Sequence, residues 1–342
     1  MDTIRVVYAS FMEPELVDRV RAVDARLDVV HRPDLLPTPR YACDHVGTPR
    51  ALTAAQSDAW RALLASAHVL FDFDYPNRDA LPALAPQLRW LQATSAGIGQ
   101  FVKRMGYADS MPQTLFTTAS GVHAIPLAEF CIMSILNHFR GLPQMQADQA
   151  ARRWERFATT DLPGKTVAVI GMGNIGAEIA RLSVAHGMRV IGSKMTPKAL
   201  PNVDHVFAHD DLHAMLREAD VVIMTAPHTP TTDQMLDAAA FTAMRDGAYF
   251  INIGRGATVD EPALVSALQS GKLAGAALDV FAEEPLPPES PLWAMPNVLV
   301  SPHSASTSDK ENQRITDLFC DNLRRFLDGR PLRNVLDTER LY

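Results

Sequence analysis

The sequence predicts an α/β fold in two domains, each built on a parallel sheet, and three observations support that class. The chain has 342 residues, which fits two domains of ordinary size. Strand-like and helix-like segments alternate along most of it, as crossover connections in parallel sheets require. Near the middle, the apolar run 166–170 leads directly into Gly171, Gly173 and Gly176 and then into an amphipathic pattern. A strand, a tight glycine turn and a helix in this order predict a βαβ unit.

The first third of the chain predicts a small parallel α/β domain. Residues 33–50 contain four prolines and predict an irregular loop. The helical pattern at 310–327 is expected to return to this domain, which then comprises residues 1–118 and 306–342. We expect strands at 4–8, 27–31, 68–73 and 88–92, and helices at 16–27 and 54–65.

Residues 119–305 predict the second domain, a doubly wound parallel sheet. A mostly apolar helix at 124–138 is expected to lead into it. The alternation predicts two Rossmann-like domains, of which the first is smaller and flavodoxin-like. The expected strands of the second domain lie at 166–170, 189–192, 220–225, 249–253, 275–279 and 298–301.

The glycines after residues 166–170 predict a dinucleotide-binding turn. Gly171 allows the tight turn, Gly173 lets the backbone approach a pyrophosphate, and Gly176 lets the helix pack close to the strand. The backbone N–H groups at the helix start, at Asn174 and Ile175, then face the anion. A plain βα turn can show the same glycine spacing, so the flanking strand and helix carry the prediction.

Composition argues against several other classes of protein. The net charge is −7 and no basic block occurs, which argues against a nucleic-acid-binding surface. Apolar stretches are too short for a membrane-spanning helix, and the first residues lack the pattern of a signal peptide. Cys43, Cys131 and Cys320 form no disulfide or metal pattern, so we expect a reducing cytoplasm.

Three histidines, His205, His209 and His213, are spaced four residues apart. On one helix that spacing could bind zinc. Residues 206–207 are typical of a strand and residues 210–211 of a helix cap. We therefore expect the histidines to lie on different elements and predict no metal site.

Polar residues follow three late strands of the second domain, and they are Arg255, Glu284 and His303. Each alone could be a solvated loop residue or a cap at a strand end. Ligands of open α/β sheets bind at the carboxyl ends of the strands. We therefore expect these three side chains to converge beside the bound dinucleotide.

Taken in order, the short motifs of this chain resemble those of the D-isomer-specific 2-hydroxyacid dehydrogenases over nearly its whole length. Each motif alone is ambiguous, but their shared order makes the resemblance specific. The motifs are Ser95-Ala96-Gly97, Ala128-Glu129-Phe130, Pro163-Gly164-Lys165-Thr166, Gly171 to Gly176, Pro227-His228-Thr229-Pro230 with Thr232, Asn252 to Gly256, Asp279 to Leu286, Pro291-Leu292-Trp293 and Pro302-His303.

The resemblance implies a role for each reacting group. It makes His303 the general acid in reduction and the base in oxidation, with Glu284 as the hydrogen-bond partner that favours the imidazolium. Arg255 is implied to hold the substrate carboxylate and polarise the keto oxygen, and the backbone of Ser95, Ala96 and Gly97 to cradle the same carboxylate. This chemistry suits the residues, because hydride addition to a ketone develops an alkoxide that needs a proton, and a guanidinium binds a carboxylate through two bonds.

The cofactor site is implied in the same way, with Asp279 contacting the nicotinamide amide. In an NAD enzyme an acid is expected about 20 residues after the glycines. Here the strand ends in Ser193 and Lys194, and a lysine can pair with a 2′-phosphate, so the sequence favours NADP. A solvent-facing Lys194 would leave NAD and NADP equally acceptable. The other implied cofactor contacts are Pro227, Thr232, Ile253, Gly254, Arg255 and His303.

The function implied by the resemblance is reduction of a small 2-keto acid, with glyoxylate and hydroxypyruvate as the first candidates. A homodimer formed through the nucleotide domain is also implied. The alternative is a non-catalytic dinucleotide-sensing protein of the same fold, similar to transcriptional co-repressors. Two features stay open: residues 71–75 either shape the substrate pocket or turn their acids away, and Trp154 either reaches a neighbouring subunit's site or packs at an interface.

Overall fold

The computed structural model describes residues 3–341, which form two compact units. The first unit runs to His123 and resumes at Thr307, and the second comprises Ala124–Ser306. Every strand pair in both sheets is parallel, so the predicted α/β class is confirmed. The first unit extends five residues beyond the expected 118, because Ala119 and Val122 pack into its core.

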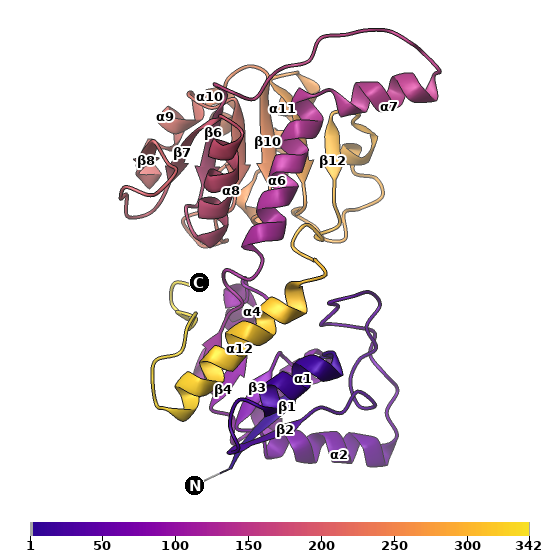
Figure 1. Ribbon diagram of the computed structural model, residues 1–342, viewed down its shortest axis with the longest axis vertical. Coiled ribbons are helices and arrows are strands. Elements are labelled where there is room, and N and C mark those ends of the chain that lie inside the picture. Colours follow the sequence, from indigo (N-terminus) through magenta and orange to yellow (C-terminus); the bar gives the residue numbers. More distant parts are fainter. Residues whose placement is uncertain (1–2, 342) are drawn as a thin grey trace. The chain divides into compact units, whose positions relative to one another are not determined.

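The sheet of the first unit has the strand order β2-β1-β3-β4-β5, which is the flavodoxin-like order; strands β1 to β4 are labelled in Figure 1. Four of these strands were expected from the sequence. The fifth, β5, was missed because its first residue, Leu115, is exposed. The strands are β1 (Ile4–Tyr8), β2 (Leu27–Val30), β3 (Val69–Phe71), β4 (Trp90–Gln92) and β5 (Leu115–Thr117).

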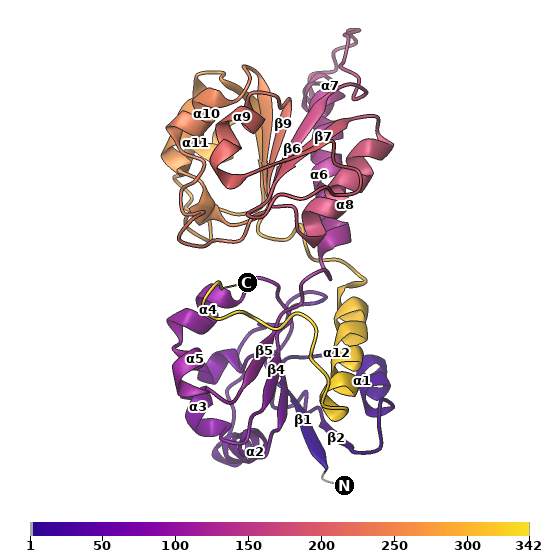
Figure 2. The same cartoon turned by 90° about the vertical axis from the view of Figure 1, so that its left-hand side faces the viewer.

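Helices cover both faces of this first sheet (Figure 2). One face is covered by α1 (Pro14–Arg21) and α12 (Glu311–Leu327), which pack against each other. The expected helix at 16–27 ends earlier, at Arg21, because Asp24 accepts hydrogen bonds from the backbone and side chain of Arg26 and forms a turn. The opposite face carries α2 (Ala54–Ala65), η1 (Tyr75–Ala80), α3 (Leu81–Leu84), α4 (Gly99–Arg104) and α5 (Tyr107–Ser110).

The proline-rich loop at 33–50 is irregular, as predicted, yet it is well held. Asp44 is buried and accepts bonds from the Arg40 side chain and from the Gly47 N–H. Thr38 and Thr48 pair in a short antiparallel bridge at the base of the loop. The bridge and the hydrogen bonds of Asp44 therefore constrain residues 39–47 of the loop.

The sheet of the second unit has the order β12-β11-β10-β9-β6-β7-β8 (Figure 1). Counted from β6, this is the doubly wound order 3-2-1-4-5-6 with one further strand. Its central strand β6 is buried on both faces, which explains the continuous apolar run. The strands are β6 (Thr166–Ile170), β7 (Arg189–Ser193), β8 (His205–Phe207), β9 (Val221–Met224), β10 (Ala248–Asn252), β11 (Leu273–Leu278) and β12 (Val298–Val300).

Two helical layers enclose this second sheet (Figure 2). One layer is α6 (Ala124–Phe139) with α8 (Asn174–Ala185), and α7 (Leu142–Ala150) follows α6. The other layer is α9 (Leu212–Leu216), α10 (Ala238–Ala243) and α11 (Glu261–Gln269). Three 3-10 turns, η2 (His209–Asp211), η3 (Gly256–Thr258) and η4 (Pro291–Ala294), complete the unit.

Two further expectations from the sequence concern metal binding and membrane-spanning helices. His205, His209 and His213 lie on β8, η2 and α9 respectively, and among residues 3–341 no group of three metal-ligating side chains is gathered. Within the same residues, the helices are all too short or too polar to cross a membrane.

Candidate active site

The glycine turn begins where β6 ends. Gly171 has φ +100°, a conformation that favours glycine, and a Cβ at Gly176 would lie 2.6 Å from the Gly171 carbonyl oxygen. The backbone conformation at Gly171 and the close packing at Gly176 therefore require glycine at both positions. A Cβ at Gly173 would meet no atom within 4 Å, so this glycine keeps open space at the start of α8. Open space beside a 12-residue helix N-terminus fits the approach of a pyrophosphate.

The end of β7 lies against the same turn. The Ser193 carbonyl oxygen accepts hydrogen bonds from the N–H groups of Gly171 and Met172. Lys194 Nζ donates to the Met172 carbonyl oxygen at 3.3 Å, so the ammonium lies beside the glycine turn. Asn174 and Ile175 form the first turn of α8. The strand therefore delivers a cation, and not the carboxylate of an NAD-type site, to this position.

A histidine–carboxylate pair lies beyond β11 and β12. His303 Nδ1 lies 2.7 Å from Glu284 Oε2, while Glu284 Oε1 accepts from the Phe281 N–H at 3.0 Å. Burial raises the pKa of Glu284, but the hydrogen bonds from His303 and Phe281 and the charges of His303 and Arg255 outweigh it and hold the pKa below its usual value. The structure thus brings together two of the three predicted reacting groups in direct contact.

Asp279, at the end of β11, holds the loop that carries His303. Its Oδ1 accepts three hydrogen bonds, from Ser301 Oγ at 2.5 Å, from the Ser304 N–H at 2.9 Å and from the Ala305 N–H at 3.0 Å. His303 lies inside this loop with φ +54°, in the left-handed region. Burial raises the pKa of Asp279, and the three hydrogen bonds offset only part of that effect.

The third predicted group, Arg255, follows β10. Its Nη1 donates to the Gly254 carbonyl oxygen at 2.7 Å, and Asn252 Oδ1 accepts from the Gly254 N–H at 3.0 Å. Burial lowers the pKa of Arg255 and the nearby charge of Glu284 offsets part of this, although a guanidinium stays charged at neutral pH. A Cβ at Gly256 would lie 1.8 Å from the Phe281 carbonyl oxygen, so Gly256 allows close contact with the segment that leads to Glu284.

The remaining predicted cofactor residues form the loop after β9 and the end of β10. Thr232 Oγ1 donates to the Pro227 carbonyl oxygen at 2.7 Å and accepts from the Thr229 N–H at 2.8 Å. Ile253 is buried directly before Gly254. These loops follow the carboxyl ends of neighbouring strands β9 and β10, where open α/β sheets bind their ligands.

The predicted substrate loop, Ser95-Ala96-Gly97, belongs to the first unit and follows β4. The Ser95 carbonyl oxygen accepts from the Ala119 N–H at 3.0 Å, and Ser95 Oγ accepts from the Gly97 N–H at 3.3 Å. The loop therefore lies at the carboxyl edge of the first sheet, and its partners come from the same unit. Arg255, Glu284, Asp279 and His303 belong to the second unit, as do the hydrogen bonds described for them.

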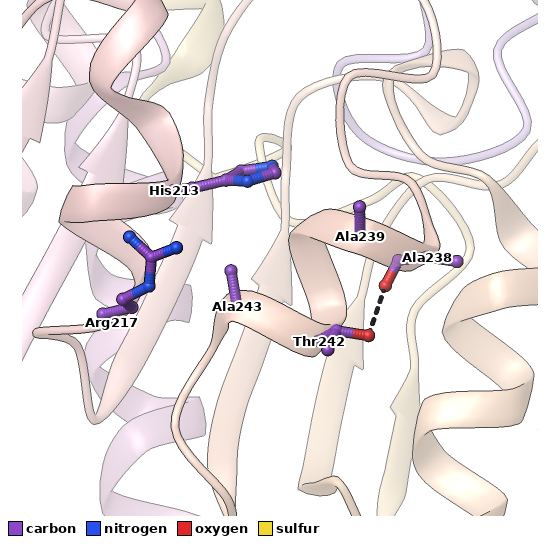
Figure 3. Close-up of a pocket in the computed structure, with 6 residues that line it drawn as sticks. All are labelled: His213, Arg217, Ala238, Ala239, Thr242 and Ala243. Carbon is purple, nitrogen blue, oxygen red and sulfur yellow. Dashed lines mark hydrogen bonds between the residues drawn. The ribbon is translucent and has the colours of Figure 1, made fainter.

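Sequence reasoning assigned no role to two residues that organise this site, Ser301 and Asn252. Asn252 began a recognised motif and Ser301 ended an expected strand, but their contribution depends on hydrogen bonds to Gly254 and to Asp279 that the sequence does not show. A shallow hollow of about 730 Å³ also lies between α9 and α10, and none of the predicted site residues lines it (Figure 3). Its lining residues are His213, Arg217, Ala238, Ala239, Thr242 and Ala243.

A doubly wound sheet with a glycine turn, an arginine and a histidine–carboxylate pair at its strand ends defines an NAD(P)-dependent oxidoreductase. The family model for the NAD-binding domain of D-isomer specific 2-hydroxyacid dehydrogenases matches residues 132–305. The chain belongs to this family, as the sequence predicted.

Relatives with named activities agree with this assignment. A glyoxylate reductase of Aeropyrum pernix is 35% identical over 65% of this chain and 69% of its own length. A glyoxylate/hydroxypyruvate reductase A of Salmonella newport is 29% identical over 75% of this chain and 82% of its own length. These named activities do not favour the alternative of a non-catalytic sensor.

Solved structures show the same two-domain architecture. A D-isomer specific 2-hydroxyacid dehydrogenase from Xanthobacter autotrophicus Py2, in complex with NADPH and MES, has a TM-score of 0.80 and 30% identity, with both chains fully covered. An NADPH-dependent glyoxylate/hydroxypyruvate reductase from Sinorhizobium meliloti, in complex with NADP and sulfate, has a TM-score of 0.79 and 25% identity, covering 99% of this chain and 100% of its own. The expected NAD(P) dependence of the family is thereby confirmed.

Proposed function

We propose that this protein reduces a small 2-keto acid to the D-2-hydroxy acid with NADPH, and that glyoxylate and hydroxypyruvate are its first candidate substrates. The observation that carries the proposal is the His303–Glu284 pair, 2.7 Å apart, with the charge of Arg255 close to Glu284. The pair supplies a proton, and Arg255 supplies a fixed cation for the substrate carboxylate.

The proton path follows from the hydrogen bonds of His303. Glu284 is ionised at neutral pH, so the His303 Nδ1 that contacts it carries hydrogen and donates. Nε2 is then the ring nitrogen that gives its proton to the developing alkoxide during reduction. The bound dinucleotide supplies the hydride, and Arg255 orients the carboxylate and polarises the keto oxygen.

Within this proposal the second unit binds the cofactor. The turn at Gly171, Gly173 and Gly176 receives the pyrophosphate at the start of α8. Asp279 Oδ1 already accepts three bonds, so Asp279 would hold the nicotinamide amide through Oδ2. The first unit binds the substrate carboxylate through the backbone of Ser95–Gly97.

NADP is proposed as the preferred cofactor because Lys194 lies beside the glycine turn and no acid ends β7. Two of the similar solved structures were determined with NADPH or NADP, which supports the same preference. Steady-state kinetics with both reduced cofactors test it. A higher kcat/KM with NADPH is expected, and a clear preference for NADH would contradict it.

We also infer a homodimer formed through the second unit. Trp154 is 97% exposed, and several other large apolar side chains on and around α6 and α7 are exposed too. Sedimentation at micromolar concentration should show a dimer, and a monomeric Trp154→Ala variant would place the interface here. The exposed side chains of this surface are Ile125, Met133, Leu142, Met145, Trp154 and Phe157.

The proposed compartment is the cytoplasm, since Cys43, Cys131 and Cys320 are free thiols and suit a reducing environment. The function itself is tested by following NADPH consumption with a panel of 2-keto acids. Turnover of glyoxylate or hydroxypyruvate is expected. Tight dinucleotide binding with no turnover of any acid would favour the sensor alternative instead.

A further inference from the structure

A small hollow lies within the first unit, where the proline-rich loop meets α2 and η1. Its volume is about 40 Å³, and the residues that line it all lie between positions 35 and 77, so the hollow belongs to one unit. One water needs roughly 10–15 Å³ by the same measure, so the space holds about three groups of that size. The hollow can therefore receive the end of a small molecule.

A buried carboxylate lines the hollow. Asp74 is only 2% exposed, and its Oδ2 accepts hydrogen bonds from Trp60 Nε1 at 2.9 Å and from Asn77 Nδ2 at 2.8 Å. Both donors are neutral, and no cation among residues 3–341 forms an ion pair with Asp74. Burial raises the pKa of Asp74, and the hydrogen bonds offset only part of that effect. This carboxylate therefore lacks the positive charge that would stabilise its ionised form.

The other walls of the hollow are mostly apolar and rigid. Leu35, Leu52 and three prolines contribute to them. Proline fixes its own backbone angle, so these walls are formed before a ligand arrives, which lowers the entropy that binding costs.

Arg50 is the second charged residue that lines the hollow, and it is exposed to solvent. Its charge acts on Asp34. Asp34 already accepts bonds from Arg32 through both of its oxygens, at 2.8 Å and 2.6 Å. Arg50 is thus available to pair with an anion that enters from the solvent side.

We propose that this hollow binds a small zwitterion, a short amino acid whose ammonium group lies at Asp74 and whose carboxylate lies at Arg50. Carboxylates and aromatic rings such as that of Trp60 hold ammonium groups in proteins, and a guanidinium binds a carboxylate through two bonds. A simple amine would leave Arg50 unpaired, and a simple carboxylate would meet the charge of Asp74. The two charges together select a molecule that carries both.

The size of the hollow limits the ligand further. The ammonium and the two methylene groups of β-alanine are three water-sized groups, which matches the space of about 40 Å³. A branched or aromatic side chain would not fit among the apolar walls. None of the lining residues has a role in the reaction proposed above, so this inference does not depend on the reductase function.

Isothermal titration calorimetry of the full chain with β-alanine, ethylammonium and propionate tests the proposal. β-Alanine is expected to bind with a Kd on the order of 1 mM, and the two singly charged probes at least about 10-fold more weakly. Asp74→Asn, which keeps an acceptor for Trp60 but removes the charge, should weaken β-alanine binding at least about 10-fold. Arg50→Gln should weaken it about 5-fold. Arg61→Gln removes an exposed arginine of α2 outside the hollow and should leave the affinity unchanged.

Absence of binding at about 20 mM β-alanine would overturn the proposal, as would equal affinity for ethylammonium or propionate. Unchanged affinity in Asp74→Asn would place the binding elsewhere and overturn it too. Thermal unfolding shows whether each variant is folded. If Asp74→Asn is not, exposed Arg50 decides: an affinity equal to that of Arg61→Gln would contradict the proposed site.

Discussion

The carboxyl edges of the two sheets differ in how completely their buried polar side chains are hydrogen-bonded. In the second unit, Asp279 Oδ1 alone accepts three hydrogen bonds, and both oxygens of Glu284 are occupied. In the first unit, His45, Asp72 and Glu311 retain buried polar atoms that have no hydrogen-bond partner among residues 3–341. We call the edge of the second sheet saturated, because the described oxygens of its carboxylates have hydrogen-bond partners, and the edge of the first sheet unsaturated. A saturated edge holds its side chains in one geometry, which suits groups that act in the same way on every substrate. The unsaturated edge leaves these side chains with hydrogen-bonding capacity that the described residues do not use.

The largest effect is expected at the saturated edge, from removal of its proton donor. His303→Ala should lower kcat about 10²-fold or more, because it removes the imidazole proposed to protonate the alkoxide. NADPH affinity should stay nearly unchanged, since the glycine turn is untouched. Stopped-flow turnover and fluorescence titration of NADPH measure the two quantities. Lost NADPH affinity with unchanged kcat would remove His303 from the chemistry.

Two glycines of the second unit, one tightly packed and one beside open space, test how rigidly this edge is packed. Gly256→Ala should destabilise the protein by about 3 kcal/mol, because its Cβ would lie 1.8 Å from the Phe281 carbonyl oxygen and the backbone must move. Gly173→Ala is the matched control, since its Cβ meets no atom within 4 Å. It should cost less than about 1 kcal/mol in urea unfolding but weaken NADPH binding. Similar stabilities for the two variants would refute the assigned packing.

The unsaturated edge makes its own contribution to stability through Glu311. Burial raises the pKa of Glu311, but His123 and His45 together lower it to about 2 in the folded protein. Its stabilisation is therefore complete above the unfolded pKa near 4.5 and is lost as pH falls from there toward 2. Glu311→Gln should therefore cost up to about 3 kcal/mol near pH 7 and much less near pH 2. Urea unfolding of wild type and variant across this range gives the difference. A cost that did not shrink in acid would mean that the carboxylate charge is not involved.

The smallest change is expected at the far end of the cofactor site. Lys194→Glu places a carboxylate where the ammonium lies beside the glycine turn. The ratio of kcat/KM for NADPH to that for NADH should fall at least about 10-fold, since an acid repels a 2′-phosphate and can bind the ribose hydroxyls. Lys198→Glu, nearby on an exposed loop, is the comparison variant. Equal effects of both variants would indicate only a general change of charge.

Local patterns predicted the elements best where each element has a continuous signal. The helix at 54–65 and the strands at 4–8 and 166–170 match the structure because a capping box marks the helix and mostly apolar runs mark the strands. The missed strand β5 begins with the exposed Leu115, whereas β3 and β4, which have the same length, are buried throughout. Element boundaries differed where a side-chain turn, such as that at Asp24, ended a helix that periodicity would continue.

The sequence predicted more of the polar residues at the sheet edge in the second unit than in the first. The glycine spacing and the polar residues after late strands indicated the second unit, because strand ends of a parallel sheet meet at one edge. The bonds of Asp279 to Ser301, Ser304 and Ala305 could not be read, since they depend on how β11 and β12 pair. His45 gave no signal at all. It meets Glu311 across more than 250 residues, and only the folded loop brings them together.

The central claim is that hydride passes to C2 of a 2-keto acid, and isotope transfer tests it most directly. Hydroxypyruvate is reduced with NADPH that carries deuterium at both C4 positions, and the product is analysed by mass spectrometry and for configuration. The account predicts a D-2-hydroxy acid with one deuterium, located at C2. A protein that binds NADPH yet yields no deuterated product from hydroxypyruvate or glyoxylate would contradict it.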